Sequence, residues 1–156
     1  MRVVIDHVAG SRRGQRQELP ANRRIRFGRH PECEVSFDPH RDIDASSRHA
    51  ELRPMEAGGT GPIDATNGWV LVDLGSSNGT YVEGHRITES PIDRNTPLAI
   101  EFGPGGPRVR LFVGDDAEIE ALPPAPVEAR DPRWLYGAIG AAGVGLVLIL
   151  LALVKC

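Results

Sequence analysis

The stretch LVDLGSSNGTYVEG, residues 71–84, constrains the fold more than any other part of the chain. Apolar and polar residues alternate before its polar turn, and a strand-like run resumes after it. Because Asn and Gly tolerate positive φ, alternation on both sides of Asn78 and Gly79 predicts two strands joined by a turn. Such a turn lifts Ser76, Ser77 and Asn78 clear of the sheet. Their side chains can offer hydrogen bonds to an outside molecule, or they can be ordinary turn residues.

Short runs of strand type recur along most of the chain. They are separated by Gly, Pro and Asn, and no long helical period appears before residue 130. This pattern is typical of an antiparallel β-sandwich or barrel. We therefore expect one all-β domain over residues 1–114. The runs are residues 3–8, 15–19, 24–28, 34–37, 50–53, 69–74, 80–82, 98–102 and 109–113.

The composition changes after residue 114. Residues 115–133 are rich in Pro, Ala and acidic residues, which predicts an extended linker without a core. The next twenty-one residues, 134–154, carry no charge. A helix of that length spans roughly 31 Å, close to the hydrocarbon core of about 30 Å. The sequence therefore predicts a C-terminal transmembrane helix, followed by a short tail of residues 155–156.

The charges that flank the predicted span indicate its orientation. Arg130 and Arg133 precede it, and Lys155 alone follows it. Under the positive-inside rule, the N-terminal domain is expected to be cytoplasmic, in a tail-anchored, single-pass protein of the cell membrane. Small residues recur every four positions on one face of the span and would permit a homodimer, although glycines are common in spans in any case. They are Gly137, Ala141 and Gly145.

The charge distribution and residue usage exclude several classes of function. Residues 1–30 carry eight Arg against Asp6 and Glu18, a charge of +6, so the rest of the chain must carry −9 to give the total of −3. A basic region suits nucleic acid or an anionic group on a protein, but aromatic residues that would interleave with it are few. Lys155 is the only lysine, which excludes phosphate loops and Schiff bases that need one elsewhere. No motif joins Ser, His and a carboxylate to activate a nucleophile. We expect no enzymatic activity.

The run DPHRDID, residues 38–44, invites a metal interpretation because carboxylates and an imidazole alternate in it. A calcium loop that began at Asp38 would need Gly at its sixth position and Glu at its twelfth. The sequence has Ile43 and His49 there. We therefore expect a solvated loop, with no metal and no cofactor.

Three segments together resemble one known family. They are FGRHPECEVSF at residues 27–37, DASSRHAEL at 44–52 and DLGSSNGTYVEGHRI at 73–87. In order and spacing they resemble the forkhead-associated (FHA) domain, a family of phosphothreonine-binding β-sandwiches. The resemblance covers about residues 1–114 and implies an FHA/SMAD-like antiparallel sandwich. The residues that carry it are Gly28, Arg29, Ser46, His49, Asn78 and Gly79.

The chemistry of phosphothreonine suits these residues. At pH 7 it carries nearly two negative charges and three strong acceptor oxygens. A fixed guanidinium such as that of Arg29 can make bidentate, charge-assisted hydrogen bonds to it. The resemblance implies that Arg29 and Ser46 hold the phosphate and that Ser77 borders the pocket. It also implies that Asn78 hydrogen-bonds the backbone of the bound peptide.

Other matched positions are expected to support the site. The resemblance implies structural roles for Gly28, His49 and Gly79. Ser47 lies where many relatives have a basic or amide side chain, so we expect weaker phosphate binding unless Arg48 turns toward the phosphate. Arg48 can equally be a solvated surface residue.

Asp44 lies where some relatives of the FHA family contact the third residue after the phosphothreonine. Its carboxylate is expected to disfavour acidic residues at that position of the peptide, because like charges repel.

These features together predict a non-enzymatic, membrane-anchored adaptor that captures threonine-phosphorylated proteins of Ser/Thr kinase signalling. Its partners would be a kinase or the substrates of that kinase. The alternative is a phosphate-independent, FHA-like scaffold of a membrane or secretion assembly. The joint presence of Arg29, Ser46 and Asn78 favours the adaptor. A nucleic-acid reader would rest only on the basic residues 1–30, and we expect none.

Overall fold

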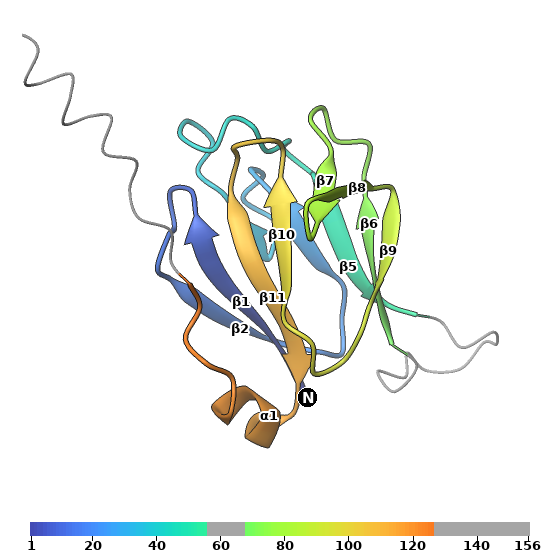
Figure 1. Cartoon of the computed structure of the whole chain (residues 1–156). Coiled ribbons are helices and arrows are strands. Elements are labelled where there is room, and N and C mark those ends of the chain that lie inside the picture. Colours follow the sequence, from blue (N-terminus) through green and yellow to red (C-terminus); the bar gives the residue numbers. More distant parts are fainter. Residues whose placement is uncertain (56–67, 127–156) are drawn as a thin grey trace, which may run out of the picture.

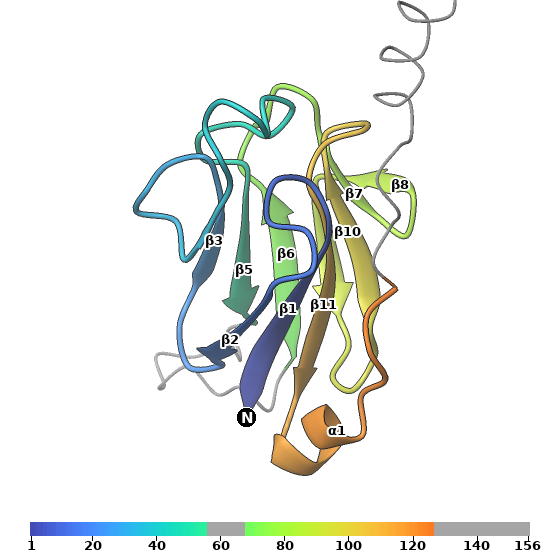
Figure 2. The same cartoon turned by 90° about the vertical axis from the view of Figure 1, so that its left-hand side faces the viewer.

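Two β-sheets pack face to face in the computed structural model, which describes residues 1–55 and 68–126 (Figures 1 and 2). The first sheet has six strands in the order β2-β1-β11-β10-β7-β8, and all its pairs are antiparallel. The expected all-β sandwich is confirmed. The strands of this sheet are β1 (Arg2–Ala9), β2 (Arg16–Pro20), β7 (Thr80–Val82), β8 (His85–Ile87), β10 (Leu98–Phe102) and β11 (Arg108–Gly114).

The second sheet has five strands in the order β4-β3-β5-β6-β9. Here β3 and β4 pair in parallel, through Phe27 with Val35 and Gly28 with Ser36. The sandwich is therefore mixed, whereas the sequence analysis expected only antiparallel pairs. A parallel contact of two residues leaves no periodic signal that a sequence could reveal. The strands are β3 (Ile25–Gly28), β4 (Val35–Ser36), β5 (Ala50–Pro54), β6 (Trp69–Asp73) and β9 (Glu89–Ile92).

The core lies between the sheets and follows the alternation along their strands. In β3, for example, Ile25 and Phe27 are fully buried, while Arg26 between them faces outward and is half-buried. The rings of Phe27 and Phe102 stack across the core with centroids 5.1 Å apart. Burying a side chain of this size contributes about 1.5–3 kcal/mol to folding. Other fully buried core residues are Ile5, Leu52, Trp69, Leu71, Ile100 and Leu111.

A short helix, α1 (Asp116–Glu120), follows β11 at the lower end of the sandwich in Figure 2 and packs on the six-stranded sheet. Asp115 and Glu118 form a capping box at its start, because each side chain accepts a hydrogen bond from the backbone N–H of the other. Ile119 is 6% exposed and packs on Val4 and Phe112. The predicted linker thus begins with a packed helical turn, which the sequence analysis expected to be extended.

The segment after α1 is fastened to the same sheet. The guanidinium of Arg110 donates to the carbonyl oxygens of Pro123 and Pro124, at 2.8 and 3.4 Å, and also binds the buried carboxylate of Asp6. Leu122 packs against the cluster around Ile119. The chain therefore leaves β11 along the outer surface of the sandwich.

Within residues 1–55 and 68–126, no helix has the length and apolar character needed to cross a bilayer. The predicted span over residues 134–154, with Gly137, Ala141 and Gly145, lies outside the described residues. So does the predicted linker beyond residue 126.

Candidate functional site

Three loops meet at one end of the sandwich, at the top of Figure 1, opposite α1. They connect β3 to β4, β4 to β5 and β6 to β7. The backbone N–H of Arg29 donates to the carbonyl oxygen of Ser46 at 3.1 Å. The hydroxyl oxygen of Ser46 accepts the backbone N–H of Ser77 at 3.0 Å. The structure therefore brings Arg29, Ser46 and Ser77 together, although they are distant in sequence.

The Arg29 side chain is held in place by backbone oxygens. Its Nε donates to the carbonyl of Ala45 at 2.6 Å, and Nη1 donates to the carbonyl of Pro39 at 2.9 Å. Neither partner is charged, and no carboxylate pairs with Arg29 among the described residues. A guanidinium has five N–H donors, so most of them stay available. Arg29 is a fixed cation with unused donors at the loop end.

Gly28 lets β3 and the β4–β5 loop come into contact. A Cβ at this position would lie 2.2 Å from the carbonyl oxygen of Ser47, too close for any side chain. That same oxygen accepts the backbone N–H of His30 at 2.9 Å. Glycine is therefore required here by close approach of two backbones.

His49 is fully buried and joins two of the loops. Its Nδ1 accepts the backbone N–H of Ser46 at 2.9 Å, and its Nε2 lies 3.0 Å from the carbonyl oxygen of Gly79. These contacts require the neutral ring with its proton on Nε2, since a carbonyl can only accept. Burial lowers the pKa of His49 below its usual value, which keeps that form.

The β6–β7 loop is organised by Asp73, which the sequence analysis did not single out as a site residue. One carboxylate oxygen accepts the backbone N–H groups of Gly75 and Ser76, both at 3.0 Å. The other accepts the hydroxyls of Ser76 and Thr80, both at 2.6 Å. Although burial works to raise the pKa of Asp73, these hydrogen bonds hold it below its usual range. An Asp before a Gly-Ser turn is a recognisable signal for such a loop.

Asn78, which is exposed, and Gly79, which is buried, follow at the end of this loop. The amide nitrogen of Asn78 donates to the carbonyl oxygen of Asp44 at 2.9 Å. Gly79 has φ +87°, which glycine adopts without strain. One hydrogen of the Asn78 amide nitrogen and the amide oxygen remain open to a ligand.

Ser47 and Arg48 are both exposed. The Nη2 of Arg48 lies 3.6 Å from a carboxylate oxygen of Glu32, and both side chains are more than half exposed. The described contact of Arg48 is therefore with the β3–β4 loop, and such an exposed pair is worth little energy.

The described residues contain no group of three or more His, Cys, Asp or Glu that could hold a metal ion. In the run of residues 38–44, Asp42 accepts hydrogen bonds from the backbone N–H groups of Ser11 and Asp38. Asp38 in turn accepts from the backbone of His40 and Arg41. The carboxylates of these two residues are thus used to shape the loop.

Several of the N-terminal arginines pair with carboxylates. Arg16 binds Asp6 at 2.6 Å and Arg26 binds Glu34 at 2.9 Å, and the hydrogen bonds from Arg26 lower the pKa of Glu34 to about 2. Arg2 pairs with Glu18. Asp6 and Glu18 are already included in the charge of +6 for residues 1–30, so of these three pairs only Arg26 with Glu34 reduces it further.

Comparisons with known proteins agree with this architecture. The sequence model of the FHA domain matches residues 8–103. An FHA domain solved in a structural and functional analysis of phosphothreonine-dependent FHA interactions is 22% identical, with a TM-score of 0.53, over 72% of this chain and 97% of that chain. The FHA domain of the CT664 protein from Chlamydia trachomatis is 23% identical, with a TM-score of 0.55, over 72% and 97%.

A third solved structure is EmbR of Mycobacterium tuberculosis in complex with a low-affinity phosphopeptide. It is 21% identical with a TM-score of 0.52, and the match covers 72% of this chain and 24% of EmbR. No curated protein sequence matches the chain. At these identities the solved structures establish the fold.

Proposed function

Because the chain belongs to the FHA domain family, whose members are interaction modules, we propose that it is an adaptor that binds phosphothreonine in partner proteins. One observation carries the proposal. Arg29 is fixed by the carbonyls of Ala45 and Pro39, beside Ser46, and no carboxylate of the described residues pairs with it. A doubly charged phosphoryl group supplies the missing negative charge.

The phosphate is held by the donors left open at the loop end. The free N–H groups of Arg29 make charge-assisted hydrogen bonds to its oxygens. Ser46 uses its oxygen to accept from Ser77, so its hydroxyl hydrogen is available to donate to the phosphate. The exposed hydroxyl of Ser77 borders the same place. Ser47 and Arg48 are exposed, and the described contact of Arg48 is with Glu32, so we expect them to add less than Arg29 and Ser46.

The peptide backbone is held by Asn78. Its amide nitrogen is anchored on the carbonyl of Asp44, which fixes the direction of the group. The remaining amide hydrogen and oxygen match one carbonyl and one N–H of an extended peptide. Asn78 therefore fixes the register of the bound peptide, while Arg29 supplies the positive charge that binds the phosphate.

We place this module at the inner face of the cell membrane. The support is the uncharged stretch of residues 134–154, with Arg130 and Arg133 on its domain side. Confinement beside a bilayer raises the effective concentration of a co-localised partner. The phosphothreonine would come from a Ser/Thr kinase or from its substrates.

A binding titration tests the proposal. The full 156-residue chain is titrated with phosphothreonine peptides and with the same peptides unphosphorylated. We expect only the phosphorylated peptides to bind, and Arg29→Ala to weaken binding at least about tenfold, since hydrogen bonds to charged groups are worth about 1.5–3 kcal/mol. Arg53→Ala, which removes an exposed arginine of β5, is the matched control and should bind as wild type. Equal binding of both peptide forms would instead support a phosphate-independent scaffold.

A further inference from the structure

Arg86 of β8 lies against the loop that carries Asn78. An ideal Cβ built on Gly79 would lie 2.6 Å from Nε of Arg86, 3.1 Å from Cζ and 3.2 Å from Nη2. The guanidinium of Arg86 therefore occupies the space beside Gly79 that a side chain at this position would need.

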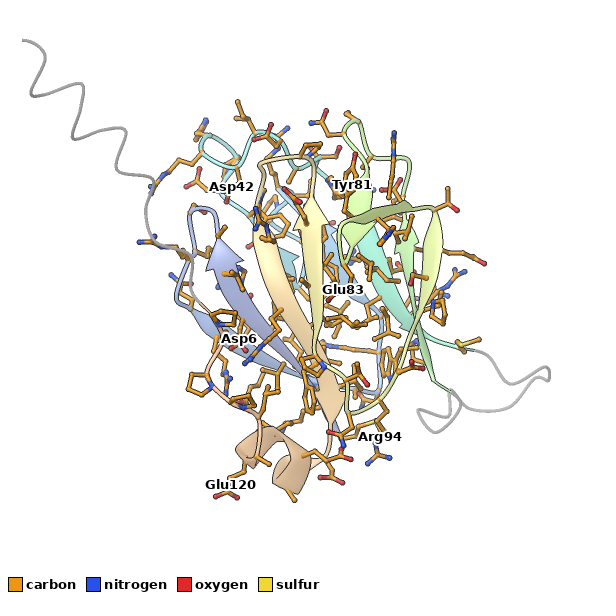
Figure 3. The ribbon with its side chains drawn as sticks, in the orientation of Figure 1. Asp6, Asp42, Tyr81, Glu83, Arg94 and Glu120 are labelled. Carbon is orange, nitrogen blue, oxygen red and sulfur yellow. The ribbon has the colours of Figure 1, made fainter. Side chains whose placement is uncertain are left out.

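The positive charge of Arg86 has no partner in the described part of the chain. Arg86 is exposed, and no hydrogen bond or ion pair joins it to another described residue. In the ladder of the six-stranded sheet it stands opposite Tyr81, and Tyr81 stands opposite Glu101 of β10 (Figure 3 labels Tyr81 near the loop end of β7). Glu101 is already engaged, because it accepts the backbone N–H of Gly105 at 2.7 Å and lies 3.8 Å from Arg108.

The surroundings of Asn78 are therefore charged with opposite sign on its two sides. On one side it donates to the backbone of Asp44, whose carboxylate forms no ion pair among the described residues. On the other side the next residue, Gly79, is covered by Arg86. A peptide that docks on Asn78 therefore passes close to one negative and one positive residue.

We propose that Arg86 is a specificity-determining residue that selects an anionic side chain, a carboxylate or a second phosphoryl group, in the peptide segment passing over Gly79. This inference rests on the proposed function, because it needs a peptide docked on Asn78. It assigns the partner class more narrowly, as phosphothreonine sequences with an acidic or phosphorylated flank on the Arg86 side. Arg29 binds the phosphothreonine, and Arg86 contacts the neighbouring charge.

The test uses a series of phosphothreonine peptides titrated into the full chain. Each flanking position in turn is changed from Ala to Glu, and the preferred position is then changed to phosphoserine. We expect Glu to tighten binding about two- to fivefold at one position or two adjacent ones, as for an exposed ion pair. Phosphoserine there should tighten binding further, since it carries more charge. If Glu tightens binding more than phosphoserine does, the anionic group that Arg86 selects is a carboxylate.

Two variants separate charge from packing. Arg86→Gln keeps a planar head group over Gly79 without the charge, and Arg86→Lys keeps the charge without the planar group. We expect Arg86→Gln to lose the preference for Glu while it binds the all-Ala peptide as wild type does. Arg86→Lys should retain the preference for Glu. Added salt should weaken this preference in wild type and in Arg86→Lys, while Arg86→Gln has no preference to lose.

Three outcomes overturn the inference. Wild type could show no preference for an acidic flank, or Arg86→Gln could weaken the all-Ala and Glu peptides equally, which would make Arg86 a packing residue only. In the third outcome the proposed function itself fails: no phosphothreonine peptide binds to wild type, or Arg29→Ala binds all of them as wild type does. That third outcome would remove the basis of both proposals.

Discussion

The hydroxyl oxygen of Ser46 accepts the backbone N–H of Ser77 at 3.0 Å, which joins two loops separated by strands β5 and β6. The hydroxyl hydrogen of Ser46 is free to donate elsewhere. One side chain therefore both assembles the site and belongs to it. The consequences of its removal should appear in folding as well as in binding.

Ser46→Ala should lower both the stability of the domain and its affinity for phosphothreonine peptides. Loss of the hydrogen bond from Ser77 is expected to reduce the free energy of unfolding by about 1 kcal/mol. Phosphothreonine peptide affinity should fall about tenfold or more, because a charge-assisted contact is lost in addition. Denaturant unfolding and calorimetric titration measure the two effects. Ser47→Ala, which alters an exposed neighbour, is the control and should change neither by much.

Stability should depend on pH through His49. The buried ring has a pKa below its ordinary value of 6.5, so the unfolded chain takes up a proton below about pH 6.5 while the folded chain does not. The contribution of His49 is therefore complete above that pH and is lost as the pH falls through the lowered pKa. Melting temperature measured against pH should decline below about pH 6.5.

Buried His7 also has a lowered pKa and would act in the same direction. In the variant His7→Gln, the remaining decline of melting temperature below about pH 6.5 is therefore due to His49. A flat profile in that variant between pH 6.5 and 5 would contradict the role of His49, because the carboxylates with lowered pKa titrate only in more acidic solution.

Gly28→Ala should destabilise the domain more than an alanine at another glycine. The new Cβ would meet the carbonyl oxygen of Ser47 at 2.2 Å, which forces β3 and the loop apart at a cost of about 2–3 kcal/mol. Gly84→Ala is the comparison, since Gly84 has φ +80° but no atom within 4 Å of the added carbon. There only the backbone strain of about 1–2 kcal/mol applies. Chemical denaturation would reveal the order, and equal losses would argue against the contact.

The packed turn after β11 should contribute to stability. Ile119→Ala removes the apolar side chain that covers Val4 and Phe112 and should cost about 2 kcal/mol, at the lower end for buried aliphatic residues because the cluster is small. Glu120→Ala alters an exposed residue of the same helix and should be nearly neutral. Unfolding curves that coincide for the two variants would mean that α1 adds nothing to the domain.

Asp44 should penalise an acidic residue three positions after the phosphothreonine. A peptide array scored on wild type and on Asp44→Asn checks this, with the penalty present in the first and relieved in the second. Like charges near a surface repel by roughly 1 kcal/mol or less, so the expected effect is a few-fold. A preference of wild type for Asp at that position would refute the expectation.

Much of the fold could be predicted because its strands alternate between one buried and one solvated face. The run that includes Ile25 and Phe27 is an example. Strands β8 and β9 were not predicted, because most of their residues are exposed and no apolar period marks them. The helix α1 was not predicted because Ile119 is the only buried residue in it, so no helical apolar period could be recognised. These elements are specified by tertiary contacts rather than by local pattern.

The convergence of Arg29, Ser46 and Ser77 agrees with what the motifs predicted, since loops at one end of a sandwich must meet. The supports behind them could not be foreseen. Arg29 is fixed by the carbonyls of Ala45 and Pro39, and a backbone carbonyl has no signature in the sequence. The placement of Arg86 over Gly79 likewise depends on how β7 and β8 pair.

The two carbonyl contacts of Arg29 have a kinetic consequence. A side chain that is already immobile loses little rotamer entropy when a ligand arrives, so no rearrangement has to precede complex formation. For a phosphorylated ligand, the rate of association is then set by diffusion and electrostatic attraction, and affinity differences among ligands appear as differences in residence time. A phosphothreonine-binding module of this design would respond to a rise in phosphorylation at the rate of encounter, and to a fall at the rate of dissociation.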